Sequence, residues 1–172
     1  MFVVLSDTHA HEPPELTGPI RDAVESAEGL IHAGDFIREP VLDAFEERAN
    51  DVIAVAGNVD DEAISQRLPR TRTFAIDGYR IALTHTVRGG ETGLAAFGRE
   101  NDADLVISGH THQPTYRWTG TIGLLNPGSH RQPRGNRAGF AILRVIDGRL
   151  EGEISDPDGT VFERFELNRA KF

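Results

Sequence analysis

The sequence predicts an α/β protein in which two packed β-sheets carry helices on their outer faces. In the first two thirds of the chain, short apolar and β-branched runs alternate with longer amphipathic stretches, which is the pattern of βα units and a largely parallel sheet. After residue 112 this alternation stops, and short strand-like runs follow one another with Asp-Gly dipeptides between them. The C-terminal third is therefore expected to pair its strands in a more antiparallel manner.

Each apolar run and each amphipathic stretch predicts one element, in chain order. The apolar runs predict strands at residues 2–6, 29–33, 51–56, 72–76, 80–84 and 104–108. The amphipathic stretches between them predict helices at residues 15–27, 39–49, 61–67 and 92–101. The C-terminal strands are expected at residues 114–118, 121–125, 138–146, 149–155 and 160–166. The dipeptides Asp77-Gly78, Asp147-Gly148 and Asp158-Gly159 favour tight turns between neighbouring strands.

Length and composition place the chain among ordinary globular proteins. Its 172 residues, 38% apolar and 26% charged, fit a single domain over residues 1–172, and the absence of cysteine excludes disulfides. The apolar runs are too short to cross a membrane, and the N-terminus lacks the basic segment of a secretory signal. These features predict a cytoplasmic protein with no membrane partner.

The charge balance excludes some partners. The chain has 18 basic and 27 acidic residues and a net charge of −9, which opposes binding to long nucleic acid. Lys171 is the single lysine. An acidic, lysine-poor surface is compatible with a halophilic source. A GC-rich genome, which favours arginine codons, would explain the shortage of lysine equally well but the acidity less well.

Side chains that bind metals follow five of the predicted strands. In open α/β sheets, functional groups gather beyond the carboxyl ends of the strands. The residues found there are Asp7, His9, Asp35, Asn58, His85, His110 and His112. A single aspartate after a strand is more often a helix cap, and a single histidine is usually structural. The complete set in this order instead predicts a site for divalent metal ions.

Seven candidate ligands exceed what one ion of four to six coordination uses, so two ions are expected, with Asp35 as the bridge if the second strand is central. Two cations about 3.5–4 Å apart serve in-line displacement at phosphorus. They would also make the pocket locally positive and attract an anionic phosphate. The sequence thus predicts metal-dependent hydrolysis of a phosphoester.

The order D-x-H, GD, GN, H and GHTH, followed by Asn126-Pro127-Gly128-Ser129, resembles the calcineurin-like metallophosphoesterase superfamily, and within it the small single-domain prokaryotic phosphodiesterases. The resemblance runs from Phe2 to Ser129 and implies a four-layer αββα sandwich of two mixed sheets flanked by helices. It also implies a division of the ligands between the two metals. One metal would take Asp7, His9, Asp35 and His112, and the other would take Asp35, Asn58, His85 and His110.

The resemblance implies hydrolysis of a small phosphodiester by a hydroxide that bridges two divalent ions. The candidate catalytic residues are His110 and Asn58, which would contact the phosphoryl group, and Asp35 as the bridge. Mn²⁺ is the metal that the resemblance favours, with Ni²⁺, Zn²⁺, Fe²⁺, Co²⁺ and Mg²⁺ as alternatives. Family relatives are often dimers or larger, so a homo-oligomer is a further expectation.

The chain departs from the wider family at Val59, where many members carry a histidine that assists the leaving group. The general acid is therefore open, as are the roles of His11, His130 and Arg134, each either at the substrate or on a loop. A phosphomonoesterase is one alternative function. A non-enzymatic scaffold is another, because the retromer subunit built on this fold shares the NPGS and GHTH segments. The complete ligand set favours an enzyme.

Overall fold

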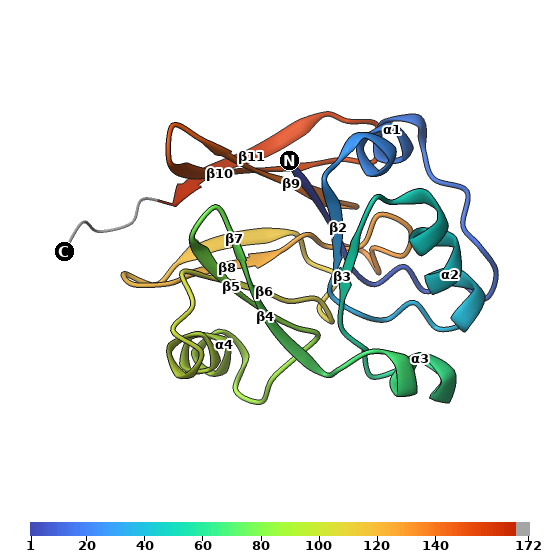
Figure 1. The fold of residues 1–172 in the computed structure, drawn as a ribbon, viewed down its shortest axis with the longest axis horizontal. Helices are drawn as coiled ribbons and strands as arrows, with labels where there is room; N and C mark the ends of the chain where they lie inside the picture. The colour runs from blue at the N-terminus through green and yellow to red at the C-terminus, as the bar shows by residue number, and fades with distance from the viewer. Residues whose placement is uncertain (168–172) are drawn as a thin grey trace.

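Two β-sheets lie face to face in the computed structural model, which describes residues 1–167 (Figure 1). The first sheet has the strand order β11-β10-β9-β1-β2-β3 and the second has the order β4-β5-β6-β8-β7. The predicted domain also includes residues 168–172, which lie outside the described residues.

The first sheet contains β1 (Phe2–Leu5), β2 (Gly29–His32), β3 (Val52–Ala54), β9 (Phe140–Ile146), β10 (Arg149–Ser155) and β11 (Val161–Leu167). The second contains β4 (Thr71–Ile76), β5 (Tyr79–Thr84), β6 (Leu105–Ile107), β7 (Thr115–Trp118) and β8 (Gly123–Asn126). Strands β1, β2 and β3 pair in parallel, and so do β5, β6 and β8. Strands β7, β9, β10 and β11 pair antiparallel, as the sequence predicts for the C-terminal third, and β4 also pairs antiparallel with β5.

Helices cover the outer faces of both sheets. The helices are α1 (Gly18–Ser26), α2 (Glu39–Arg48), α3 (Glu62–Arg67) and α4 (Gly90–Glu100). Helices α1 and α2 pack on the first sheet, where Ile20 and Phe45 share one apolar cluster with Leu5. Helix α4 packs on the second sheet, where Leu94 joins a cluster with Val106. The predicted four-layer αββα sandwich is therefore confirmed.

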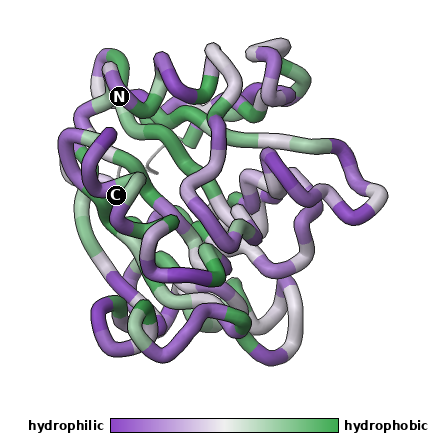
Figure 2. Tube along the Cα trace, turned by 90° about the vertical axis from the view of Figure 1, so that its right-hand side faces the viewer, coloured by the Kyte–Doolittle hydropathy of each residue, from purple (hydrophilic) through white to green (hydrophobic). Residues whose placement is uncertain are grey.

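The alternation of strand side chains produces these layers. Successive residues of a strand point to opposite faces. In β1, Val3 and Leu5 face the helices, whereas Val4 faces the second sheet together with Ile81 and Leu105. Figure 2 shows hydrophobic stretches running through the interior and hydrophilic residues on many of the outer turns. The interior between the sheets is thus formed by every second residue of the strands.

Two helices begin two or more residues away from the predicted position. Helix α1 starts at Gly18 rather than at residue 15, with Thr17 as its N-cap and a proline in the first turn, where a missing N–H costs nothing. Helix α4 starts at Gly90 rather than at residue 92, because Gly89 turns the chain into the helix with φ 93°.

Within the described residues, no helix is both long and apolar enough to cross a membrane.

Candidate metal centre

Five of the seven predicted ligand residues have left-handed backbone conformations. The φ angles are 52° at Asp7, 44° at His9, 62° at Asp35, 71° at His110 and 57° at His112. This region costs a residue with a β-carbon roughly 1–2 kcal/mol. Such strain persists only where the surroundings enforce it, and it concentrates at functional sites. The backbone therefore marks the ends of β1, β2 and β6 as a site independently of the side-chain types.

The side chains of Asp7, His9 and His112 form one group. The Nε2 atom of His112 lies 3.2 Å from Oδ1 of Asp7, and Nε2 of His9 lies 3.8 Å from the same oxygen. All three residues are buried, and these three atoms have no hydrogen-bond partner. A buried polar atom without a partner is costly, so convergence of three such atoms fits a bound cation.

The side chains of Asn58, His85 and His110 form a second group. Nε2 of His85 and Nδ1 of His110 each lie 2.9 Å from Oδ1 of Asn58. His85 is buried, whereas Asn58 and His110 are exposed. This half of the site therefore opens to solvent, where a substrate can approach.

Asp35 lies between the two groups. Its Oδ2 atom is 3.3 Å from Nε2 of His9 and 3.2 Å from Nε2 of His85. The sequence predicts Asp35 as the bridge on the condition that the second strand is central in its sheet. This condition does not hold, because β2 lies second from the edge of the first sheet and β1 lies near the middle. Asp35 reaches both groups because the carboxyl end of β2 faces β5 across the interface between the sheets, where the Nδ1 atom of His85 contacts the Ala33 carbonyl.

Backbone carbonyls orient two of the imidazoles. The Nδ1–H of His85 donates to the carbonyl of Ala33 at 2.7 Å, and the Nδ1–H of His112 donates to the carbonyl of Gln132. In both rings Nε2 then faces the carboxylates, and in the neutral imidazole this nitrogen carries the free lone pair. Histidines that bind metals commonly donate their other nitrogen in this way. In His85 this Nε2 meets the amide oxygen of Asn58, so two acceptors converge where a cation would satisfy both.

The pKa values follow from the same arrangement. The carboxylates of Asp35 and Asp7 raise the pKa of His9 to about 9, although burial opposes this. Burial also opposes the charged form of His85, but the Asp35 carboxylate outweighs it and raises the pKa of that ring. For Asp35, burial would raise the pKa, but the imidazoles of His85 and His9 lower it overall. The carboxylates thus favour positive charge at His9 and His85, as expected beside a cation site.

Two glycines allow the ligand loops to approach one another. A β-carbon at Gly57 would lie 2.0 Å from Oδ1 of Asp35, and one at Gly109 would lie 1.9 Å from Oγ of Ser6. Both distances are far below van der Waals contact. The glycines of the GN and GHTH motifs are therefore required by packing at the centre.

Asp60 is a supporting residue that the sequence analysis did not assign. Its carboxylate accepts hydrogen bonds from the backbone N–H groups of Ile37 at 2.7 Å, Gly57 at 2.7 Å and Asp35 at 3.1 Å. These bonds join the loop after β2 to the loop after β3. The sequence signal is an acidic residue two positions after Asn58, where it can turn back onto its own loop.

Side chains at the end of β8 and in the segment that follows it donate hydrogen bonds to the ligand loops. Oγ of Ser129 donates to the carbonyl of Asp7 at 2.7 Å, and Nδ2 of Asn126 donates to the carbonyl of Gly109 at 2.8 Å. Nη1 of Arg131 donates to the carbonyl of His9 at 2.7 Å. The NPGS motif and Arg131 therefore hold the backbone of two ligands, Asp7 and His9, and of Gly109, which precedes the ligand His110.

The structure distinguishes the residues whose roles were open. Val59 is 43% exposed and its backbone N–H donates to Oδ1 of Asp35, so an apolar side chain borders the centre at this position. His11 lies on an exposed loop, and both ring nitrogens of His130 are buried without a partner. Arg134 is exposed, with φ 51°, and its charge adds to burial in lowering the pKa of His112. Of these four residues, Arg134 is therefore the one whose charge acts on a predicted metal ligand, His112.

The sandwich and the cluster of carboxylates and imidazoles define a metal-binding α/β protein with its site at the carboxyl ends of strands. The chain belongs to the calcineurin-like phosphoesterase superfamily, whose domain model matches residues 1–148. Membership in this family and the names of its relatives identify a metal-dependent phosphoesterase, a hydrolase.

Relatives and solved structures agree with this family. A probable metallophosphoesterase of Methanothermobacter thermautotrophicus is 37% identical over 155 residues, which covers 88% of this chain and 89% of the relative. The phosphodiesterase YfcE of Escherichia coli is 36% identical over 134 residues, which covers 74% of this chain and 70% of YfcE. The crystal structure of Vps29 complexed with zinc, from Entamoeba histolytica, is 26% identical with a TM-score of 0.79, and the match covers 97% of this chain and 99% of Vps29.

Proposed function

We propose that this protein hydrolyses small phosphodiesters at a centre of two divalent metal ions. The observation that carries the proposal is the position of the Asp35 carboxylate, which contacts one imidazole of each ligand group. One ion would bind Asp7, His9, Asp35 and His112, and the other would bind Asp35, Asn58, His85 and His110. Nitrogen and oxygen ligands without thiolate suit Mn²⁺, which is the first metal to test.

The bound ions would supply an activated water at neutral pH and neutralise charge on the phosphoryl oxygens. The chain itself contributes orientation. His110 and Asn58 are exposed at the open side of the centre, so they are the residues placed to contact a phosphoryl oxygen. The amide oxygen of Asn58 faces His85 and His110, which leaves its amide nitrogen to donate a hydrogen bond to the substrate.

Arg134 is the proposed phosphate-binding cation outside the ligand set. Its guanidinium is exposed and acts electrostatically on His112, and no carboxylate within residues 1–167 forms an ion pair with it. A free guanidinium near an open metal centre can bind a phosphate oxygen. The Arg134 charge would bind the substrate before the reaction as well as during it. Removal of this charge by Arg134→Ala should therefore raise KM more than it lowers kcat.

One feature favours a diester over a monoester, and a second bears on the leaving group. The relatives include proteins named phosphodiesterase, among them YfcE. Val59 also replaces the histidine that assists leaving groups in many family members, so substrates with good leaving groups should react best. The alternative activity is phosphomonoester hydrolysis, and only a comparison of diester and monoester substrates distinguishes it from the proposed activity.

The test is hydrolysis of bis(p-nitrophenyl) phosphate beside p-nitrophenyl phosphate. The protein is treated with a chelator, dialysed and assayed before and after addition of Mn²⁺. We expect turnover of the diester that requires the metal and is lost in His112→Ala. The matched control is His11→Ala, which removes an exposed histidine outside the centre.

Any of three results would overturn the proposal. Turnover that survives chelation, or that survives in His112→Ala, would place the activity at another site. A folded, metal-binding protein that hydrolyses neither ester would instead favour the scaffold function, and a search for protein partners would follow.

A further inference from the structure

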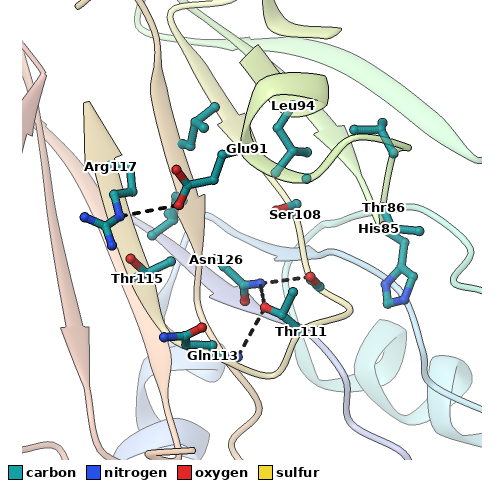
Figure 3. A pocket seen from close by; sticks show the side chains of 15 residues that line it. His85, Thr86, Glu91, Leu94, Ser108, Thr111, Gln113, Thr115, Arg117 and Asn126 are labelled. Atoms are coloured by element: carbon teal, nitrogen blue, oxygen red, sulfur yellow. Dashed lines mark hydrogen bonds and ion pairs between the residues drawn. The ribbon is translucent and has the colours of Figure 1, made fainter. Parts of the chain in front are cut away.

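A cavity of about 220 Å³ lies beside the centre, between helix α4 and the edge strand β7 (Figure 3). Its apolar wall is formed by Val87, Leu94 and Leu124, and its polar side by Gln113 and Thr115. Helix α4 packs on β6 and β8, whereas β7 lies beyond them at the edge of the sheet. The cavity is the space that this helix leaves uncovered on the outer face of the sheet.

The cavity reaches the loops that carry the predicted metal ligands. His85 lines it directly, and Gly109 and Thr111, which flank His110 in the sequence, line it as well. Nδ2 of Asn126 holds this end in place through the carbonyl of Gly109 and Oγ1 of Thr111 (Figure 3). A group attached to a phosphate at the centre can therefore extend into the cavity.

The charges at the cavity cancel. Nε of Arg117 lies 3.4 Å from Oε1 of Glu91, and the two side chains form an ion pair on one side of the cavity (Figure 3). No other lysine, arginine, aspartate or glutamate of the described chain lines it. A second phosphate would find no unpaired cation there. An uncharged group would instead contact the apolar wall and find hydrogen-bonding partners in Ser108 and Thr115.

We propose that this cavity binds one uncharged ester substituent of the substrate, of aryl or similar apolar character, while the phosphoryl group lies at the metal centre. The inference rests on the proposed function and narrows its substrate class to diesters with at least one such substituent. Burial of an aromatic ring against Leu94 and Leu124 should improve binding by at least about tenfold over a methyl substituent.

The first experiment compares the binding of two stable diesters, diphenyl phosphate and dimethyl phosphate. Calorimetry of the Zn²⁺-loaded protein should give diphenyl phosphate a Kd at least about tenfold lower. Thr115→Phe fills the cavity from β7 and should abolish this preference. The matched control is Thr73→Phe, the same substitution on the other edge strand of the sheet, and it should retain the preference.

A second measurement needs no variant. Diphenyl phosphate should shift the methyl NMR signals of Leu94 and Leu124 in the Zn²⁺-loaded protein, because an aromatic ring in the cavity would lie against them. Dimethyl phosphate should leave these signals in place. Equal Kd values for the two diesters, a preference that persists in Thr115→Phe, or unshifted leucine methyl signals would overturn the inference.

These binding measurements separate the inference from the proposed function. If the protein prefers diphenyl phosphate through this cavity but hydrolyses no ester, the proposed function is wrong and the binding site stands. If it hydrolyses bis(p-nitrophenyl) phosphate without any preference between the two ligands, the function stands and the assignment of the cavity is wrong.

Discussion

At the scale of single residues, Asp35 combines two properties that seldom occur together. Its carboxylate contacts imidazoles from both ligand groups, and its backbone lies in the left-handed region with φ 62°. Asparagine and aspartate tolerate that region better than other residues with a β-carbon. An asparagine can also still accept the hydrogen bond from the N–H of Val59 at 3.1 Å.

Asp35→Asn should therefore fold normally and lose activity. The substitution removes the negative charge that both ions would share, so kcat should fall by roughly 100-fold or more, the scale of losing one electrostatic group from an active site. Circular dichroism checks the fold, and metal analysis with steady-state kinetics checks the centre. A well-folded variant that keeps two ions and full turnover would contradict the bridging role.

His130 makes stability depend on pH. Burial, with a smaller effect from Arg131, lowers its pKa from 6.5 to about 4. Between these values the unfolded chain binds a proton that the folded protein does not, so the free energy of unfolding falls as the pH falls from 6.5 to 4. A shift of about 2.5 pKa units corresponds to a loss of about 3 kcal/mol.

The measurement is urea unfolding of wild type and His130→Leu from pH 7 to pH 4, both with chelator so that metal release does not contribute. The wild type should lose about 3 kcal/mol more than the variant over this range. His11→Leu, at an exposed position, should follow the wild type. Parallel pH profiles for wild type and His130→Leu would show that folding does not lower the pKa of His130.

At the scale of elements, the site depends on how one loop holds the next. Asp60 bonds to backbone N–H groups of two loops, which follow the parallel neighbours β2 and β3. Burial raises the pKa of Asp60 despite these bonds. Neither strand by itself would place the ligand side chains, because both loops have irregular backbones.

Asp60→Ala should loosen this connection. Leaving backbone N–H groups without their acceptor costs about 1–3 kcal/mol of stability, and loss of a group that supports metal ligands typically weakens metal affinity by about 10–100-fold. Thermal unfolding and Mn²⁺ titration would measure both effects. Asp22→Ala, an exposed position on α1, is the control, since its ion pair with Arg21 at 3.7 Å should contribute little. Unchanged metal affinity in Asp60→Ala would refute the supporting role.

At the scale of the whole molecule, metal binding should raise stability, since the ligands come from loops of both sheets. A ligand that binds only the folded state stabilises it by about 2.7 kcal/mol at 100 times its Kd, or roughly 5–10 °C in Tm for a chain of this size. Scanning calorimetry before and after chelation measures this difference. Coincident melting curves would show that the centre does not bind metal tightly.

The net charge of −9 predicts a response to salt. Repulsion between acidic groups is screened at high ionic strength, so Tm should rise from low to multimolar NaCl if the acidic surface is a halophilic adaptation. Surface ion pairs such as that of Arg67 with Asp43 act in the opposite direction, because salt weakens them. A Tm that falls steadily with salt would argue against the halophilic interpretation.

The sequence by itself determined the elements and the chemistry of the ligands. Every strand and helix of the described chain was predictable, because hydrophobic periodicity is a local property of the sequence. The errors fell at element ends such as Gly18 and Gly90, where single residues decide the backbone conformation. Oxygen and imidazole side chains at the ends of strands were also readable as a set.

Only the tertiary structure decided how these residues meet. It placed Asp35 between His9 and His85, gave the ligands their left-handed backbones, and used Asp60 and Ser129 to hold the loops. It also left the cavity between α4 and β7. These features depend on contacts between segments far apart in the chain, so a local sequence pattern marks some of the residues, such as Asp60 and Ser129, but not the contacts that they make. The packing of two sheets decides them together.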